Sequence, residues 1–501
     1  MLSSPPSARF RWDTAGAAPI AHVSALARTA RRALRSALLL SAVALAASAG
    51  AAAGREPGAA LVLRNVTLID ATGRSPRPGT TVVVTAGRIS AIGSREAIAI
   101  PEHAELVDGS GKFLIPGLWD MHTHWSRTEF LPLYIANGVT GIRLLRGLPV
   151  HQQWRNAVAK NELLAPHLVI ASPLVDGPNP VHRDSITAGD ADEGRTAVAK
   201  AVGGGADFIK VYSLLPRDAY FGIIDEAKRR NIPVAGHVPR AITTREASDA
   251  GQKSIEHLSG IAFACSRLQA ELPADIAKLE AEAAAGASYL TLLRRLEGKH
   301  LDAYDARRCT ALFARFRRNG TWHVPTLLVN RAAGLQSAPD FADPRRAYLP
   351  AAARSTNPLD HPVYKHFSAA DYMRLSKNQA QEMRIVGAMQ RAGVGILAGT
   401  DMLPIGFGLH DELALLVESG LTPMEALQAA TRNPAAYLGQ LDRFGTIEVG
   451  KQADLILLDA DPLGDIRNTR KISAVVLGGR LFTRTELDRM LADVKIAADR
   501  P

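Results

Sequence analysis

The stretch Pro116-Gly117-Leu118-Trp119-Asp120-Met121-His122-Thr123-His124 decides the fold of this 501-residue chain. Apolar residues at 113–118 lead into it and predict a buried strand. Residues two apart in an extended chain point to the same face, so His122 and His124 can present two imidazoles side by side where the strand ends. One divalent metal ion needs such a pair as its first two ligands. Two unrelated polar histidines are the alternative, and a three-residue motif alone leaves it open.

Composition and charge narrow the class of protein. Apolar residues make up 47% of the chain and charged residues 22%, which is typical of globular proteins. The length allows two or three domains, or one large barrel with a smaller unit. Half of the formal charge of +10 comes from residues 1–54, which carry six arginines and one aspartate. We find no basic stripe with interleaved aromatic residues, so nucleic-acid binding is not predicted.

Residues 1–54 have the pattern of an export leader. Three arginines precede an apolar run at 37–49, which is too short to span a membrane and fits the core of a signal peptide. Small-x-small cleavage patterns end at Ala49 and Ala53. We predict a periplasmic or secreted protein with no membrane contact after cleavage. An uncleaved anchor or a buried helix is the alternative.

Strand-like segments lie at both ends of the remaining chain. They are residues 61–70, 81–85, 88–92, a hairpin of 106–108 with 112–114, 445–459 and a hairpin at 475–481. Neither end makes a complete sheet alone. The prediction is one β-sandwich built from residues 55–115 and 443–483, followed by a helical tail at 484–501.

Between these ends, residues 116–442 alternate strand-like and helical stretches. The strand candidates are 113–118, 139–145, 167–171, 208–212, 233–237, 254–257, 322–328 and 395–401. The helical candidates are 195–203, 217–230, 244–251, 409–418 and 423–431. Repeated β–α units with parallel strands predict an α/β fold, a (β/α)8 TIM barrel inserted in the sandwich. Residues 262–318 are mostly helical and charged, and are predicted to form an enlarged loop.

Polar side chains stand at the ends of several predicted strands, where barrel enzymes carry their chemistry. They are His122, His124, Lys210, His237, His257 and Asp401. Each has an ordinary explanation alone, as a hydrogen-bonded histidine or a solvated lysine or aspartate. Their common position predicts a single site.

The motifs around these residues resemble the amidohydrolase superfamily, and are most similar to its imidazolonepropionase-like enzymes and Xaa-Pro dipeptidases (prolidases). The resemblance runs from Leu61 to Leu481. It includes residues 62–69, 116–124, Gly138-Val139-Thr140, 208–212, Gly236-His237-Val238, Glu256-His257-Leu258, Gly399-Thr400-Asp401 and 445–459. These motifs are specific for the superfamily and much less specific for a substrate.

The resemblance implies two divalent metal ions, usually zinc. His122, His124 and Asp401 would hold the more buried ion. His237 and His257 would hold the more exposed ion. No ligand position of the family pattern is missing, which argues against a non-catalytic relative.

The resemblance also implies that Lys210 is carboxylated by carbon dioxide and bridges both ions. An ammonium group repels cations, whereas a carbamate is an anion whose two oxygens can span two metals. Asp401 would take the proton from the attacking water and pass it to the leaving nitrogen.

Further polar residues are predicted to contact substrate. Arg143 and Arg146 follow the second strand and could hold a carboxylate bidentately, with surface arginines as the alternative. His182 and Arg183 lie in a loop rich in proline and glycine after the third strand, and His182 is a candidate for polarising a carbonyl. Tyr212 shares a strand face with the predicted lysine ligand and binds substrate or packs.

Cys265 and Cys309 are the two cysteines, and both lie in the helical insertion. Export would place them in an oxidising compartment, which predicts a disulfide. Buried free thiols are the alternative.

The leading hypothesis is a metal-dependent hydrolase of an amide or peptide C–N bond. Its small-molecule substrate would carry a free carboxylate, as in an Xaa-Pro dipeptide or an N-acyl amino acid. A hydrolase of a cyclic amide, a lactone or a phosphotriester on the same metal site is the second hypothesis. A non-catalytic binding protein is the third, and a homo-oligomer stays open.

Overall fold

The structure is a computed structural model that describes residues 60–329, 331, 343–355, 366–402 and 404–500. The predicted leader lies outside the described residues, so export and cleavage stay predictions. Among the helices described, none combines the length and apolar character needed to cross a membrane.

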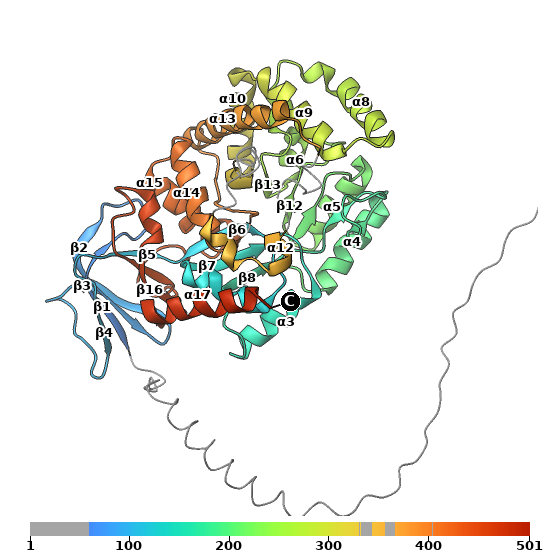
Figure 1. The fold of residues 1–501 in the computed structure, drawn as a ribbon. Helices are drawn as coiled ribbons and strands as arrows, with labels where there is room; N and C mark the ends of the chain where they lie inside the picture. The colour runs from blue at the N-terminus through green and yellow to red at the C-terminus, as the bar shows by residue number, and fades with distance from the viewer. Residues whose placement is uncertain (1–59, 330, 332–342, 356–365, 403, 501) are drawn as a thin grey trace, which may run out of the picture. The chain divides into compact units, whose positions relative to one another are not determined.

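Strands from both ends of residues 58–501 share one sheet (Figure 1). Its order is β17 (Arg480–Thr483), β16 (Ile472–Leu477), β15 (Leu455–Leu458), β5 (Phe113–Pro116), β1 (Leu61–Leu68), β2 (Arg77–Thr85) and β3 (Arg88–Ser94). β5 is the link, because it pairs antiparallel with β15 and parallel with β1. An apolar cluster that includes Leu63, Val82 and Leu457 packs against this sheet.

The predicted hairpin of residues 106–108 and 112–114 is wrong. β4 (Glu105–Asp108) and β5 both run parallel to β1, β4 beside residues 61–64 and β5 beside Thr67 and Leu68. The turn at 109–111 therefore moves the chain along β1 instead of reversing it. Gly109 lies so close to the Val66 side chain that a Cβ atom would collide there, which presses the turn against β1.

The predicted strand 113–118 is divided between two sheets. β5 ends at Pro116 in the terminal sheet, and β6 (Leu118–Thr123) begins the parallel strands. Gly117 joins them, and a Cβ atom there would clash with Thr140. The terminal sheet and the strand that carries His122 are thus connected by a single residue.

Parallel pairing continues from β6 and returns to it. The pairs run from β6 to β7 (Val139–Leu144), β8 (His167–Ile170), β11 (Ile209–Val211), β12 (Val234–Gly236), β13 (Ser254–Glu256) and β14 (Trp322–Val324). Single bridges join Ala171 to Phe208 and His323 to Ile396. The Met121 N–H donates to the Ala398 carbonyl at 2.9 Å. Residues 395–401 make these contacts without forming the regular strand that was predicted.

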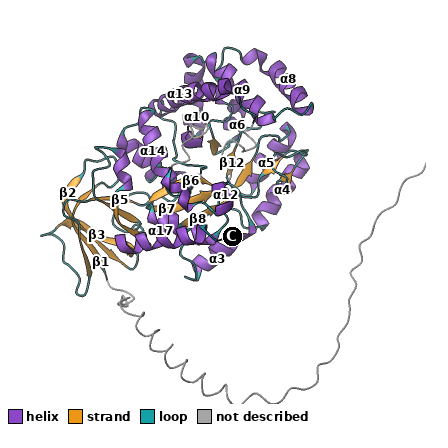
Figure 2. Ribbon diagram, viewed as in Figure 1, coloured by secondary structure: helices purple, strands orange, loops and turns teal. Residues whose placement is uncertain are grey.

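Helices follow most of the parallel strands, and in Figure 2 purple helices lie around the orange strands β6, β7, β8 and β12. Those that overlap predicted helices are α4 (Ala191–Gly203), α5 (Arg217–Arg229), α6 (Thr244–Ala250), α14 (Gly408–Glu418) and α15 (Pro423–Ala429). The others are α2 (Pro132–Ala136), α3 (Pro149–Ala159), α12 (Ala351–Ser355), α13 (Ala369–Arg391), α16 (Arg432–Leu438) and α17 (Arg484–Ala498), the last in the predicted helical tail. Short strands β9 (Val175–Asp176) and β10 (Ile186–Thr187) follow β8.

The predicted insertion at 262–318 is helical. It contains α7 (Ile261–Ala264), α8 (Leu272–Ala284), α9 (Tyr289–Asp302) and α10 (Ala306–Asn319). A disulfide joins Cys265, after α7, to Cys309 in α10. Arg295 of α9 donates to the Asp371 carboxylate of α13 at 2.8 Å. This contact joins the insertion to the helix that lies between β14 and residues 395–401.

Candidate metal centre

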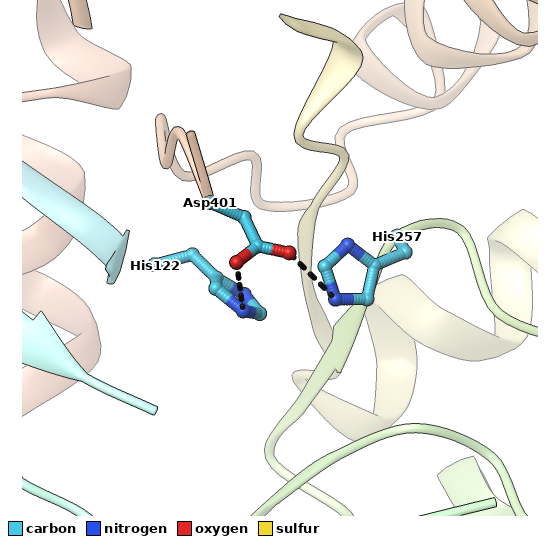
Figure 3. Close-up of side chains that lie close together, drawn as sticks. All are labelled: His122, His257 and Asp401. Atoms are coloured by element: carbon cyan, nitrogen blue, oxygen red, sulfur yellow. Dashed lines mark ion pairs between the residues drawn. The ribbon is translucent and has the colours of Figure 1, made fainter. Parts of the chain in front are cut away.

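Four imidazoles and one carboxylate converge at the ends of the parallel strands. Figure 3 shows the Asp401 carboxylate between His122 and His257. Its Oδ1 lies 3.9 Å from His122 Nε2 and 3.4 Å from His124 Nε2, and its Oδ2 lies 3.7 Å from His257 Nε2. The His237 ring is centred 5.0 Å from the His257 ring. Five of the six predicted ligands therefore lie close together.

Hydrogen bonds at Nδ1 orient three of the rings, and that of His237 is with Ser213 Oγ at 2.8 Å. His122 Nδ1 lies 2.9 Å from Glu256 Oε2, and His257 Nδ1 lies 2.7 Å from Thr326 Oγ1. The Thr326 hydroxyl already donates to the preceding carbonyl at 2.8 Å, so it accepts from His257. With the proton on Nδ1, the Nε2 atoms of His122 and His257 each direct a lone pair toward Asp401. This is the tautomer that a metal-binding histidine uses.

The imidazoles of the site are held neutral. Burial, together with the nearby Lys210, lowers the pKa of His237 and His124, to about 3 for His124. Burial also lowers the pKa of His122 and His257 well below the usual value. His122 Nε2 and His124 Nε2 are 3.3 Å apart, and among the described residues His124 Nδ1 has no hydrogen-bond partner. Neutral nitrogens packed beside a carboxylate suit a divalent cation, so these residues fit a metal ion.

Lys210 is the middle residue of β11 and is buried. Its Nζ is 6.0 Å from the centre of the Tyr212 ring. Burial lowers the pKa of Lys210, although the Glu256 and Asp401 carboxylates act in the opposite direction. A buried lysine with a lowered pKa has a larger fraction of neutral, nucleophilic amine near neutral pH.

Beneath the histidines lies a layer of fully buried polar residues, here called the floor: Asp120, Arg143, Ser254 and Glu256. Arg143 donates to both Glu256 oxygens at 2.9 and 3.0 Å and to Ser254 Oγ at 3.0 Å. It also donates to the Met121 carbonyl and the Tyr437 hydroxyl. Burial raises the pKa of Glu256, but Arg143 and Lys210 outweigh it and the net shift is downward.

Arg143 was predicted to bind a substrate carboxylate, and its position corrects that assignment. Its guanidinium makes five hydrogen bonds to protein groups and the residue has no exposed surface. No donor is left for a ligand. We assign Arg143 to the floor, where it holds Glu256 ionised beneath His122.

Asp120 and Glu256 are functional residues that the sequence reasoning did not assign. The Asp120 carboxylate accepts from the His122 N–H at 3.1 Å, the Thr400 N–H at 3.0 Å and the Thr400 hydroxyl at 2.7 Å. It thereby connects the strand that carries two ligands to the segment that carries Asp401. A carboxylate inside an apolar strand requires partners when buried, and that signal was available in the sequence.

The backbone is strained at several residues of the site. Asp401, His257, Leu258 and Thr326 all have positive φ angles, between 47° and 58°. Such angles are uncommon for residues other than glycine and persist where surrounding contacts hold them. These four strained residues are predicted ligands or lie beside or in contact with one.

The predicted substrate residues other than Arg143 form a group here called the rim: Arg146, His182, Arg183 and Tyr212. The Tyr212 ring stacks on the His237 ring with centroids 4.1 Å apart. His182 Nε2 lies 3.3 Å from the Tyr212 hydroxyl. Burial and Arg146 lower the pKa of His182, which favours the neutral ring. Tyr212 therefore contacts the predicted ligand His237 directly, and His182 reaches it through Tyr212.

The two arginines of the rim differ. Arg146 pairs with Asp184, and its buried Nε has no partner among the described residues. Arg183 is exposed. Arg146 therefore keeps one donor that no described residue uses.

Comparison with solved structures identifies the fold. "AH, Bottromycin amidohydrolase" superposes with a TM-score of 0.68 at 23% identity, covering 89% of this chain and 91% of that one. A putative prolidase from Bifidobacterium longum superposes with a TM-score of 0.62 at 24% identity, covering 87% of this chain and 99% of that one. At these identities the likeness shows the fold alone.

The family follows from the sequence. The model of the amidohydrolase family matches residues 113–482, so the chain belongs to that family. An adenine deaminase from Rubrobacter xylanophilus is 24% identical over 448 residues, 85% of this chain but 59% of that protein. Because the chain spans less than two thirds of that relative, its substrate has to be inferred from its own site.

Proposed function

We propose that this protein is a metal-dependent hydrolase of an amide or peptide C–N bond, built on a (β/α)8 barrel. The observation that carries the proposal is the convergence of neutral imidazoles on the Asp401 carboxylate, with the Nε2 atoms of His122 and His257 directed toward it. This arrangement provides ligands for divalent ions, and the family pattern favours two zinc ions. Bound metal would polarise the substrate carbonyl and supply a hydroxide nucleophile.

Lys210 is proposed to carry a carbamate that bridges the two ion positions. Its neutral amine adds to carbon dioxide, forming an N–C bond and releasing one proton. The lowered pKa of Lys210 supports this step, since only the unprotonated amine reacts. The product is an anion in a place where an ammonium group would repel metal ions.

Asp401 is proposed as the proton carrier. Burial raises the pKa of its carboxyl group, so it can accept a proton from the attacking water and release it to the leaving nitrogen. Its two oxygens already face different histidines, His124 and His257, so it lies central to the reacting groups.

The rim supports a substrate that has a free carboxylate next to the scissile bond. Tyr212 stacks on the predicted ligand His237 and His182 lies beside the Tyr212 hydroxyl, which supports a role for both in contacting the reacting carbonyl group. Arg146 offers a buried donor without a protein partner. An Xaa-Pro dipeptide or an N-acyl amino acid has both groups in this relation.

The test is turnover of a dipeptide and N-acyl-amino-acid library by metal-loaded protein, with Lys210→Ala as the matched variant. We expect hydrolysis by the wild type and a fall of roughly 1,000-fold in kcat/KM for the variant, about 4 kcal/mol, with partial rescue by short carboxylic acids. Metal content measured beside activity should fall as well. Unchanged turnover by Lys210→Ala would refute the proposed bridging role.

Export is proposed on the leader pattern of residues 1–54, with the Cys265–Cys309 disulfide in support, because disulfides persist in oxidising compartments. N-terminal sequencing of the mature protein should find it to begin after Ala49 or Ala53. An intact N-terminus on cytosolic protein contradicts the proposal.

A further inference from the structure

The residue that orients His257 is itself held in an unfavourable conformation. Thr326 follows β14 with a φ of 47°, which is strained for a β-branched residue. Its hydroxyl accepts from His257 Nδ1 at 2.7 Å. Such a conformation costs roughly 1–3 kcal/mol and needs outside contacts to persist.

Those contacts come from helix α14. Glu412 is fully buried, and its Oε1 accepts from the Leu327 N–H at 3.0 Å while its Oε2 accepts from the Leu328 N–H at 2.8 Å. The chain becomes helical at residues 327–329, and these N–H groups belong to its first turn, where no intrahelical acceptor exists. Both carboxylate oxygens are therefore spent on the residues that directly follow Thr326.

We propose that Glu412 is a positioning residue for the metal centre: it fixes residues 326–328 and, through Thr326, aims His257 Nε2. The proposal rests on the proposed metal-dependent function. Burial raises the pKa of Glu412 to about 8 although the two backbone donors lower it, and no described residue pairs with it as a cation. A buried carboxylate is costly unless hydrogen-bonded, so these two donors hold Glu412 in place. Glu412 lies in α14, whereas the predicted ligands lie in strands, loops and turns.

The two halves of the centre are supported separately. His122 is held by Glu256 at its ring and by Asp120 at its backbone. The His257 ring is oriented by its hydrogen bond to Thr326, and the His257 backbone N–H donates to the Val324 carbonyl of β14 at 2.9 Å. Loss of Glu412 should therefore weaken the ion held by His257 and spare the ion held by His122.

The experiment is titration of metal-free protein with Co²⁺, followed by visible absorption, on the full chain. Glu412→Gln puts an amide N–H₂ against one of the two backbone donors, and Thr326→Val removes the hydroxyl but keeps the β-branched shape. We expect each to weaken one of the two Co²⁺ sites by roughly tenfold or more, as loss of an orienting partner typically does. Glu418→Gln on the exposed side of the same helix is the control and should leave both sites unchanged.

The double variant decides whether Glu412 acts through Thr326. If it does, Glu412→Gln with Thr326→Val should bind Co²⁺ no more weakly than Thr326→Val alone. Additive losses, or a lowered Tm with both Co²⁺ affinities intact, overturn the inference. Thr326→Ser, which keeps the hydroxyl, should restore affinity, and failure to do so also counts against it.

Two further measurements keep the result interpretable. If Glu412→Gln does not fold, Glu412→Asp keeps the carboxyl group on a side chain that is one methylene shorter. This variant should weaken the same Co²⁺ site, and an unaltered site contradicts the inference. If the wild type binds Co²⁺ at two sites and the variants weaken one of them, but the wild type hydrolyses no amide, the proposed function is refuted and the positioning role of Glu412 is supported. Wild-type protein that binds no Co²⁺ removes both.

Discussion

The floor and the rim of the site differ in how their polar groups are satisfied. Arg143 and Glu256 in the floor have no exposed surface and bond to one another and to neighbouring protein groups. In the rim, Arg146 keeps an unpartnered buried Nε and Arg183 is exposed. Each region contains an arginine from the same stretch of chain, since Arg143 lies within β7 and Arg146 follows it three positions later.

This difference separates two tasks. A closed network of buried charges holds the metal ligands and has no capacity for a variable partner. A group with spare donors can bind substrate but adds little to stability. We therefore expect changes in the floor to alter stability and changes in the rim to alter substrate selection.

Asp401 lies between the two regions, and its loss should have the largest effect on turnover. Asp401→Asn removes the proton carrier while keeping its size, so kcat should fall roughly 100- to 10,000-fold. Metal content should fall less, because the histidines remain. Steady-state kinetics with metal analysis on the same samples checks this, and near-normal turnover would show that the assigned mechanism is wrong.

Glu256→Gln should damage the floor. It leaves the buried Arg143 without its counter-charge, and breaking a buried ion pair in this way costs about 3–5 kcal/mol. We expect a corresponding fall in the free energy of unfolding, measured in urea on metal-free protein. Arg146→Ala is the matched rim variant and should unfold within about 1 kcal/mol of wild type. Equal losses from both variants would erase the distinction between floor and rim.

Amidating the substrate carboxylate should test the rim directly. We expect kcat/KM of the wild type to fall roughly tenfold or more, about 1.4 kcal/mol of transition-state binding. Arg146→Ala should lower kcat/KM for the acid by a similar factor and respond little to amidation. Equal turnover of acid and amide by the wild type rules out this recognition mode and leaves the hydrolase proposal standing.

The sequence predicts that these side chains meet because they stand at or near the ends of apolar strands, and parallel strands bring their ends together. His122, His237 and His257 needed only that local signal. Arg143 did not fit the same logic, since β7 is buried along its whole length and alternation cannot tell its inner from its outer face. Its partner Glu256 is 113 residues away in the chain.

Other features have no local signal at all. Glu412 and Leu327 are separated by 85 residues, and only the folded chain shows that they meet. The glycine-containing turn at 109–111 indicates where the strands on either side of it end, but it does not indicate the direction that the chain takes after it. Long-range pairing and turn geometry are the parts that periodicity leaves undetermined.

Arg183→Ala should give the smallest effect and marks the outer limit of the rim. Its side chain is exposed, and a solvent-screened charge contributes between 0 and about 1 kcal/mol to an interaction. We therefore expect kcat/KM to fall by no more than about fivefold for an acid substrate, and the remaining effect to shrink as salt is raised. Arg146, whose free Nε is buried, should keep its effect at high salt. A salt-insensitive loss of tenfold or more in kcat/KM for Arg183→Ala would mean that this arginine contacts bound substrate directly, as Arg146 is expected to do.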